Sequence, residues 1–174
     1  MRVVVLGTSG SGKTTLASDI AKHHKLKHIE LDVLYWNPGW QPTPMPVFLE
    51  KIQQQLNENS NWVVCGNYNQ AKQITLPQAT HIIWLDYALH LNLWRVFIRS
   101  LQRILGGGEP FKGCPETFRQ TFFSRQSLLL WVLNTHKRRR TEFTELLTQS
   151  NFPNAKIYRV QSNRELDLLK TELL

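Results

Sequence analysis

The most constraining feature of the sequence is a glycine-rich segment near its start, Gly7-Thr-Ser-Gly-Ser-Gly-Lys-Thr14. This segment fits the pattern G-x-x-x-x-G-K-[ST], in which the glycines let successive backbone N–H groups surround a phosphate. An apolar run at 2–6 precedes the segment, and apolar residues at helical spacing follow it. A strand before the loop and a helix after it are what a phosphate loop requires, because the positive end of the helix adds to the anion site. This context favours a phosphate-binding loop over an accidental match or a structural glycine turn.

The loop residues have distinct expected roles toward ATP. Lys13 is expected to reach the β and γ phosphates, and the Thr14 hydroxyl to take a coordination position on Mg²⁺. ATP and Mg²⁺ are therefore the expected cofactors. The predicted nucleotide contacts are Gly7, Thr8, Ser9, Gly10, Ser11, Gly12, Lys13, Thr14 and Thr15.

Short apolar runs alternate with amphipathic stretches along the chain, which predicts an α/β fold with a parallel five-stranded sheet and helices on both faces. We expect a single domain over 1–174. The predicted strands are 2–6, 28–32, 62–65, 81–86 and 156–160. The predicted helices are 13–23, 47–57, 89–105, 116–134, 137–147 and 164–173, and 35–46 is expected to be a proline-rich loop.

Composition excludes several other classes of protein. With 174 residues, 41% hydrophobic and 20% charged, the chain holds a real core and is neither disordered nor embedded in a membrane. Its apolar runs are too short for a signal peptide or a spanning helix, so we expect a cytoplasmic protein with no membrane partner. Cys65 and Cys114 lie far apart without CxxC spacing and are expected to be reduced thiols.

The formal charge of +8 is concentrated in the middle of the chain, where residues 88–140 hold ten basic and two acidic side chains. Such a segment attracts an anion, either the polyphosphate of a nucleotide or the backbone of a nucleic acid; a solvated face is the third interpretation. Arg95, Arg99 and Arg103 are four apart and share one helix face, which fits a role in neutralising a transferring phosphoryl group. The glycines at 106–108 predict a hinge, with 106–140 as a helical lid. The lid would carry Arg119, Arg125, Lys137, Arg138, Arg139 and Arg140.

Asp32 is predicted to end the second strand, at the edge of an α/β sheet where ligands bind. A carboxylate there can deprotonate an acceptor hydroxyl or hold a water on Mg²⁺, although turn aspartates are common at such sites. Asp86 is expected simply to cap the helix that follows it. Two interpretations fit Trp36 and Trp40 equally well: contact with the ring of the acceptor, and ordinary packing. The remaining tryptophans are expected in the core: Trp62, Trp84, Trp94 and Trp131.

Several motifs together resemble a known group of proteins. They are the glycine-rich loop, Leu31-Asp-Val-Leu-Tyr-Trp-Asn-Pro-Gly-Trp40, Trp62-Val-Val-Cys-Gly-Asn-Tyr68, Ile82-Ile-Trp-Leu-Asp86 with Trp94-Arg95, and Gly113-Cys-Pro-Glu116. The chain resembles the kinase branch of the P-loop NTPases, which includes adenylate, shikimate and gluconate kinases. Over nearly its full length it is similar to the adenylate-kinase-like DNA topology modulation (FlaR-related) proteins.

The resemblance implies a strand order of second, third, first, fourth and fifth. It also implies an acceptor-binding region at 33–60, with Asn67 and Tyr68 as further acceptor contacts, and an adenine site near 161–163. Two departures stand out. Cys65 occupies a position where relatives commonly have an aspartate that helps to hold Mg²⁺, and Lys72 is the only basic residue in 66–81, where nucleoside monophosphate kinases place an arginine.

The sequence thus predicts an ATP-dependent phosphotransferase acting on a small acceptor that bears a hydroxyl or phosphate. Its predicted catalytic residues are Lys13, Asp32, Arg95, Arg99, Arg103 and Arg138. The predicted acceptor contacts are Asp32, Trp36, Trp40, Asn67 and Tyr68. One alternative is a nucleotide-regulated nucleic-acid-binding protein that uses the basic 88–140 face. The other is an ATP-binding protein without turnover.

Overall fold

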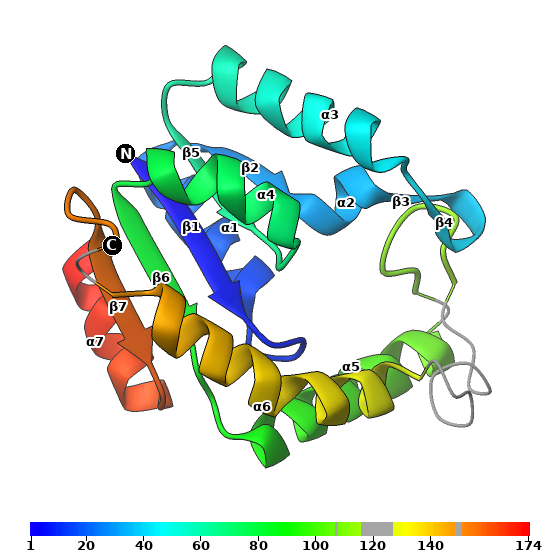
Figure 1. Ribbon diagram of the computed structural model, residues 1–174. Helices are drawn as coiled ribbons and strands as arrows, with labels where there is room; N and C mark the ends of the chain where they lie inside the picture. The colour runs from blue at the N-terminus through cyan, green and yellow to red at the C-terminus, as the bar shows by residue number, and fades with distance from the viewer. Residues whose placement is uncertain (107, 116–126, 149–150) are drawn as a thin grey trace.

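The computed structural model describes residues 1–106, 108–115, 127–148 and 151–174. At its centre is a parallel sheet of five strands in the order β2-β5-β1-β6-β7 (Figure 1). The strands are β1 (Arg2–Gly7), β2 (Lys27–Glu30), β5 (Trp62–Cys65), β6 (His81–Leu85) and β7 (Lys156–Val160). The predicted sheet and its strand order are both confirmed. The sheet places β1, which leads into the glycine-rich loop, between β5 and β6.

Helices cover both faces of this sheet, as predicted. On one face lie α1 (Lys13–His24) and α7 (Asn163–Leu173), and on the other α3 (Met45–Glu58) and α4 (Asn69–Thr75). Successive residues of a strand point to opposite faces. Val5 therefore packs with Ile20 of α1, while Val4 packs with Phe48 of α3. These two cores hold the helices against the sheet, and the candidate site lies at the carboxyl ends of its strands.

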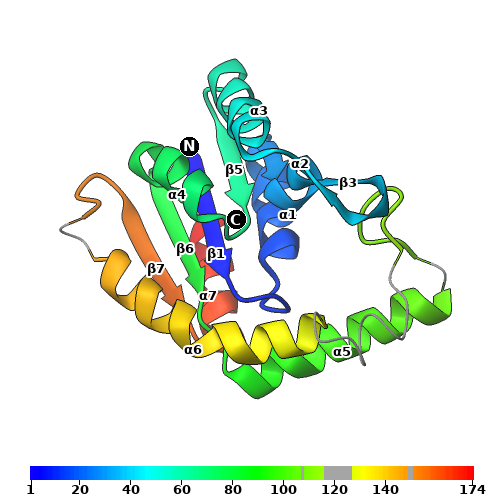
Figure 2. The same cartoon turned by 45° about the vertical axis from the view of Figure 1, so that its right-hand side comes forward.

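Two long helices run side by side across the carboxyl ends of the central strands (Figures 1 and 2). They are α5 (Leu89–Gly106) and α6 (Leu128–Leu146). A Cβ added at Gly10 would lie 2.5 Å from the Asn92 carbonyl oxygen and 2.7 Å from Val96 Cγ2, so the loop lies directly against α5. Only a glycine permits this approach.

The segment after β2 differs from its prediction. The strand ends at Glu30, and Asp32 lies in the first turn of a short helix, α2 (Leu31–Tyr35), because the chain turns there to bury Leu31. The expected loop contains a small hairpin of β3 (Trp36–Asn37) and β4 (Gln41–Pro42), joined by a 3₁₀ turn (Pro38–Trp40). Helix α4 was not predicted, since its seven polar-rich residues carry little periodicity.

Helix α6 is continuous through 134–137, where the sequence analysis expects one helix to end and another to begin. Val132, Thr135 and Phe143 are all buried, and their spacing places them on one helix face. The single buried stripe explains why the helix does not break. The predicted helical residues 116–126, with Arg119 and Arg125, lie outside the described residues.

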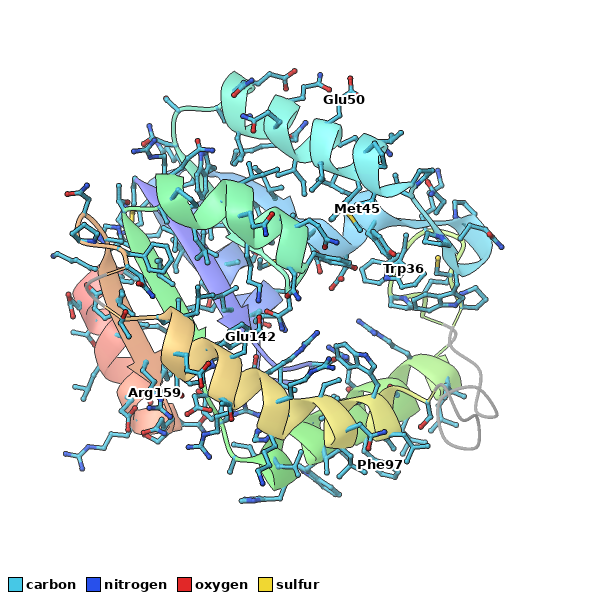
Figure 3. All side chains as sticks on the ribbon, in the orientation of Figure 1. Trp36, Met45, Glu50, Phe97, Glu142 and Arg159 are labelled. Atoms are coloured by element: carbon cyan, nitrogen blue, oxygen red, sulfur yellow. The ribbon has the colours of Figure 1, made fainter. Side chains whose placement is uncertain are left out.

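The prediction that four tryptophans lie in the core is confirmed for the two in the sheet and is wrong for the two in the long helices. Trp62 and Trp84 are buried, but Trp94 is 61% exposed and Trp131 is 42% exposed. In α5 the small residues Val96 and Ser100 pack inward, which turns the Trp94 side of the helix outward. Figure 3 shows Phe97, which stacks on Trp94, at the outer edge of the helical pair. No helix in the described residues is both long and apolar enough to cross a membrane.

Candidate functional site

The glycine-rich loop presents unpartnered hydrogen-bond donors. Gly10 and Gly12 have φ angles of 83° and 93°, in the left-handed region that favours glycine. The N–H groups of Ser9, Gly10 and Gly12 have no acceptor among the described residues, and the buried Ser11 hydroxyl likewise has no partner there. Ser11 is buried and Ser9 and Gly10 are partly buried, and buried donors that lack acceptors are costly unless water or an anion satisfies them. The loop therefore fits a bound phosphate group.

Lys13 extends back across this loop, and its Nζ donates to the carbonyl oxygen of Thr8 over 3.0 Å. Burial lowers the pKa of Lys13 to about 8, although the nearby Asp32 carboxylate opposes this effect. The positive charges of Arg139 and Arg99 lower the same pKa further. Asp32, Arg99 and Arg139 thus all lie within electrostatic reach of Lys13, and among these four side chains three cations face one carboxylate.

Asp32 is held in place by Tyr68, which lies between β5 and α4. The Tyr68 hydroxyl donates to Asp32 Oδ1 over 2.6 Å, and burial together with this carboxylate raises the pKa of Tyr68. The tyrosine therefore stays protonated and orients the carboxylate. Asn67 bonds both the carbonyl oxygen and the N–H of Gly7, which fastens the end of β5 to the start of the loop. The structure thus brings the predicted Asp32, Asn67 and Tyr68 together with the loop.

A second carboxylate, absent from the predicted site residues, lies beside Thr14. The Thr14 hydroxyl donates to Glu30 Oε1 over 3.0 Å, and Glu30 is the register partner of Cys65 in the β2–β5 pair. Burial raises the pKa of the Cys65 thiol to about 12, and the Glu30 carboxylate adds to that rise. Cys65 is therefore a neutral thiol. The sequence signal for Glu30 was its spacing, since it lies two residues before Asp32 and alternate residues of a strand share a face.

The three α5 arginines do not converge on one point. The Arg95 guanidinium lies over the Tyr87 ring, 4.5 Å from its centroid, and its Nη2 donates to Asn163 Oδ1 over 2.9 Å. Arg99 Nη2 approaches the Ser9 hydroxyl at 3.5 Å, so it contacts the loop. The Arg103 side chain runs past Gly108. Of the three, Arg99 is the one that the structure joins to the phosphate loop.

On α6 the structure places Arg139, rather than the predicted Arg138, toward the site. Arg138 is exposed, whereas Arg139 is half-buried with its guanidinium 4.2 Å from the centroid of the Trp131 ring. The Nη1 of Arg139 is buried and has no hydrogen-bond partner among the described residues. Burial lowers the pKa of Arg139, while the Asp32 carboxylate raises it. Arg139 thus interacts electrostatically with Asp32 and has a buried donor, Nη1, that is available to an anion.

Asp86 does not cap a helix; it joins three elements. Its buried carboxylate accepts from Arg159 Nε and Nη2 over 3.0 and 2.6 Å, and from Gln161 Nε2 over 3.0 Å. Arg140 Nε of α6 lies 3.2 Å from its other oxygen. Lys72, the basic residue noted after β5, pairs with Glu142 of α6. Helix α6 is therefore attached to the end of β6 and to α4 by two residues that follow Arg139.

Trp36 and Trp40 take part in packing between the hairpin and residues 109–115. Their rings meet edge to face at 5.5 Å, and Trp40 Nε1 donates to the carbonyl oxygen of Pro115 over 3.0 Å. Gly39 N–H donates to the Gly113 carbonyl oxygen over 2.7 Å. In Figure 3 Trp36 lies beside this hairpin. The first described residues of the predicted lid are thus fastened to the predicted acceptor-binding region.

Comparison with known proteins relates this fold to kinases. No family model and no curated protein matches the chain. A sugar kinase from Janibacter sp. HTCC2649 matches with a TM-score of 0.58 and 18% identity, over 99% of this chain and 91% of the other. Shikimate kinase from Aquifex aeolicus vf5 matches with a TM-score of 0.55 and 17% identity, over 99% and 96%. The chain shares the fold of these kinases. A shikimate kinase from Acinetobacter baumannii in complex with shikimate also matches, with a TM-score of 0.55 and 13% identity over 99% and 92%.

Proposed function

We propose that this chain is an ATP-dependent phosphotransferase that acts on a hydroxyl group of a small molecule. The observation that carries the proposal is the placement of Asp32, oriented by Tyr68, within electrostatic reach of Lys13 on the glycine-rich loop. Phosphoryl transfer requires mainly that donor and acceptor be positioned and that charge be neutralised. The fold shared with a sugar kinase and shikimate kinases supports the same reaction class.

The donor side of the site is formed by the loop. Its free N–H groups and Lys13 would hold the β and γ phosphates of ATP, and Arg99 adds positive charge beside Ser9. Arg95, which lies between Tyr87 and Asn163, would border the base rather than the transferring group. Thr14 would hold Mg²⁺, which on binding would neutralise phosphate charge. The residues present fit both cofactors, because the loop donors lack acceptors and Thr14 offers a hydroxyl oxygen.

The acceptor side of the site is formed by Asp32. Since Tyr68 occupies Oδ1, the second carboxylate oxygen is left to accept the hydrogen of the acceptor hydroxyl. Asp32 would take that proton as the hydroxyl oxygen bonds to the γ phosphorus and the bond from phosphorus to the ADP oxygen breaks. We place the acceptor against residues 33–60. The role predicted for Arg138 passes in this proposal to Arg139, whose unpartnered Nη1 would bind an anionic oxygen of the acceptor or of the transferring group.

A metabolite screen with an Asp32 variant tests this proposal. Incubation of the protein with ATP, Mg²⁺ and pools of hydroxylated metabolites should yield a product heavier by one phosphoryl group, detected by mass spectrometry. Asp32→Asn should keep ATP binding but lower turnover by about 10²- to 10⁴-fold, as loss of a general base does. The matched control is Asp167→Asn, which changes an exposed aspartate on α7 and should leave turnover unchanged. Normal turnover by Asp32→Asn would refute the assignment.

Nucleic-acid binding through the basic 88–140 segment is the competing proposal. Some of the basic residues that suggested it have partners within the protein: Arg139 interacts with the Asp32 carboxylate, and Arg140 pairs with the buried Asp86 carboxylate. The exposed ones for which the structure describes burial are Lys112, Lys137, Arg138 and Arg140. Binding through phosphates should weaken steeply and log-linearly with salt concentration. A flat or absent response near physiological salt would remove this alternative.

A further inference from the structure

Helix α5 carries large apolar side chains on the side that is turned away from the protein interior. Its inner side holds Asn92, Val96 and Ser100, which are fully buried. Trp94 and Leu105 lie on the opposite side and are 61% and 79% exposed. Two further apolar residues share that side, at spacings of three and four, and complete what we call the outer stripe. The outer stripe consists of Trp94, Phe97, Leu101 and Leu105.

Helix α6 extends this apolar surface. Leu130 and Leu133 are 43% and 45% exposed, and Leu130 lies about half a turn from the buried Val132. Figure 2 shows α5 and α6 side by side along one edge of the molecule, so their outer sides form a single surface. A contiguous apolar surface that is exposed on a folded domain marks a place where another surface binds.

The charges around the outer stripe argue against a lipid membrane as the partner. Helices that lie on membranes carry Lys and Arg beside their apolar face, where these cations contact anionic headgroups. None of the four stripe positions is charged. Arg95 and Arg99 of the same helix are directed elsewhere, toward the start of α7 and the glycine-rich loop. Lys137, one turn beyond Leu133 on α6, borders the surface at one end. The stripe therefore fits a partner surface that is itself apolar and uncharged.

A second copy of this chain provides such a surface. Antiparallel pairing of two α5 helices about the middle of the stripe would set Trp94 against Leu105 and Phe97 against Leu101, so each ring meets a smaller side chain. Helix α5 has 18 residues and is about 27 Å long, and the two helices together are about 20 Å wide. Their outer side thus covers about 500 Å² in projection. Protruding side chains raise its accessible area toward the roughly 600–800 Å² per partner of the smaller specific complexes.

We propose that the outer stripe of α5, with Leu130 and Leu133 of α6, is the interface of a homodimer in which two α5 helices pack antiparallel across a two-fold axis. Trp94 would be its main contact, since buried tryptophans dominate the energetics of interfaces. Each chain carries a formal charge of +8, so the two copies repel one another at low salt. Added salt screens that repulsion, and the dimer should tighten as salt rises. This inference is independent of the proposed phosphotransferase activity.

Sedimentation velocity over a dilution series at micromolar concentrations tests the interface. The wild-type protein should change from monomer to dimer with increasing concentration, and the dimer fraction should grow with added NaCl. Trp94→Gln should raise the dissociation constant of the dimer by about 10- to 100-fold without altering the net charge. The matched control is Leu168→Gln on α7, which changes a leucine that is 64% exposed and should leave the dimer unchanged. Circular dichroism checks that both variants fold.

Cysteine cross-linking tests the antiparallel arrangement and does not depend on the Trp94 variant. With copper phenanthroline as the oxidant, Leu101→Cys should form a disulfide between two copies, because position 101 lies close to the proposed axis. Leu105→Cys should cross-link far less, because its two copies would lie at opposite ends of the interface. The reverse order of cross-linking would overturn the proposal.

Three results of the sedimentation experiments would also overturn the proposed dimer. They are a wild-type protein that stays monomeric throughout the series, a Trp94→Gln dimer as tight as the wild-type dimer, and a dimer that weakens as salt rises. Flotation of a monomeric wild-type protein with vesicles of phosphatidylserine and phosphatidylcholine would instead identify a lipid surface as the partner.

Discussion

ATP binding should draw a proton onto Lys13. In the protein without ligand, burial and the charges of Arg139 and Arg99 hold the pKa of Lys13 at about 8. A polyphosphate beside the ammonium group favours the charged form, so the bound-state pKa should rise well above this value. The phosphates of ATP are themselves fully ionised at pH 8 and above. The proton must therefore come from solvent.

The expected size of this effect follows from the pKa. At pH 8 about half of the free protein carries a neutral Lys13, so binding should take up about half a proton; at pH 9 the uptake should approach one proton. The apparent dissociation constant should rise about tenfold between pH 7 and pH 9, which corresponds to about 1.4 kcal/mol. The lowered pKa of Lys13 also affects the folding stability of the protein without ligand. The unfolded chain binds more protons than the folded one between the two Lys13 pKa values, so this residue makes stability rise with pH from about 8 to 10.5.

Isothermal calorimetry at pH 8 and pH 9, in buffers of different ionisation enthalpy, measures the uptake directly. The slope of observed enthalpy against buffer enthalpy gives the number of protons bound. Lys13→Met should abolish the slope and leave a weak, pH-independent affinity from the loop N–H groups. In the wild type, a dissociation constant that does not change from pH 7 to pH 9, together with a binding enthalpy that does not depend on the buffer, would refute the reasoning. Lys13 would then not be a desolvated amine that becomes protonated when ATP binds.

Two further predictions concern the loop and the junction at Asp86. Gly10→Ala should weaken ATP binding and lower thermal stability more than Gly12→Ala, because both have positive φ but only the first would bring a Cβ within 2.5 Å of the Asn92 carbonyl oxygen. Equal losses of affinity and melting temperature would contradict this. Asp86→Ala should destabilise the fold by about 1.5–3 kcal/mol in urea unfolding, because it removes the charge-assisted hydrogen bonds that the buried carboxylate accepts, while the partly exposed Arg140 and Arg159 stay in contact with solvent. A loss below 1 kcal/mol would show the junction to be energetically neutral.

The sheet could be predicted because its signals are local. Residues 3–6, 62–65 and 82–85 are continuous apolar runs, which are typical of strands buried on both faces. The glycine-rich loop then fixes the position of β1 relative to α1. Hairpin β3–β4 escaped prediction because it depends on contacts with distant residues, such as the bond from Gly39 to the Gly113 carbonyl oxygen.

The prediction that Trp94 lies on the buried face of α5 is wrong for a related reason. Large apolar side chains at helical spacing normally mark the buried face. In α5, however, close approach of the glycine-rich loop selects small side chains for the inner face, Val96 and Ser100, and leaves Trp94 exposed. A periodic pattern records that a helix has two faces. It does not record which face has room for tryptophan, since that depends on the element packed against it.

The choice of Arg139 over Arg138 depends on the same kind of tertiary constraint. A run of four basic residues contains no internal signal for which one faces inward. The register of α6 is set from its C-terminal half, where Phe143 is buried against Trp84 and Glu142 pairs with Lys72. With Phe143 fixed inward, the residue one helical turn earlier faces the same side, and that residue is Arg139. Core packing at Phe143 thus decides which cation of the basic run faces the site.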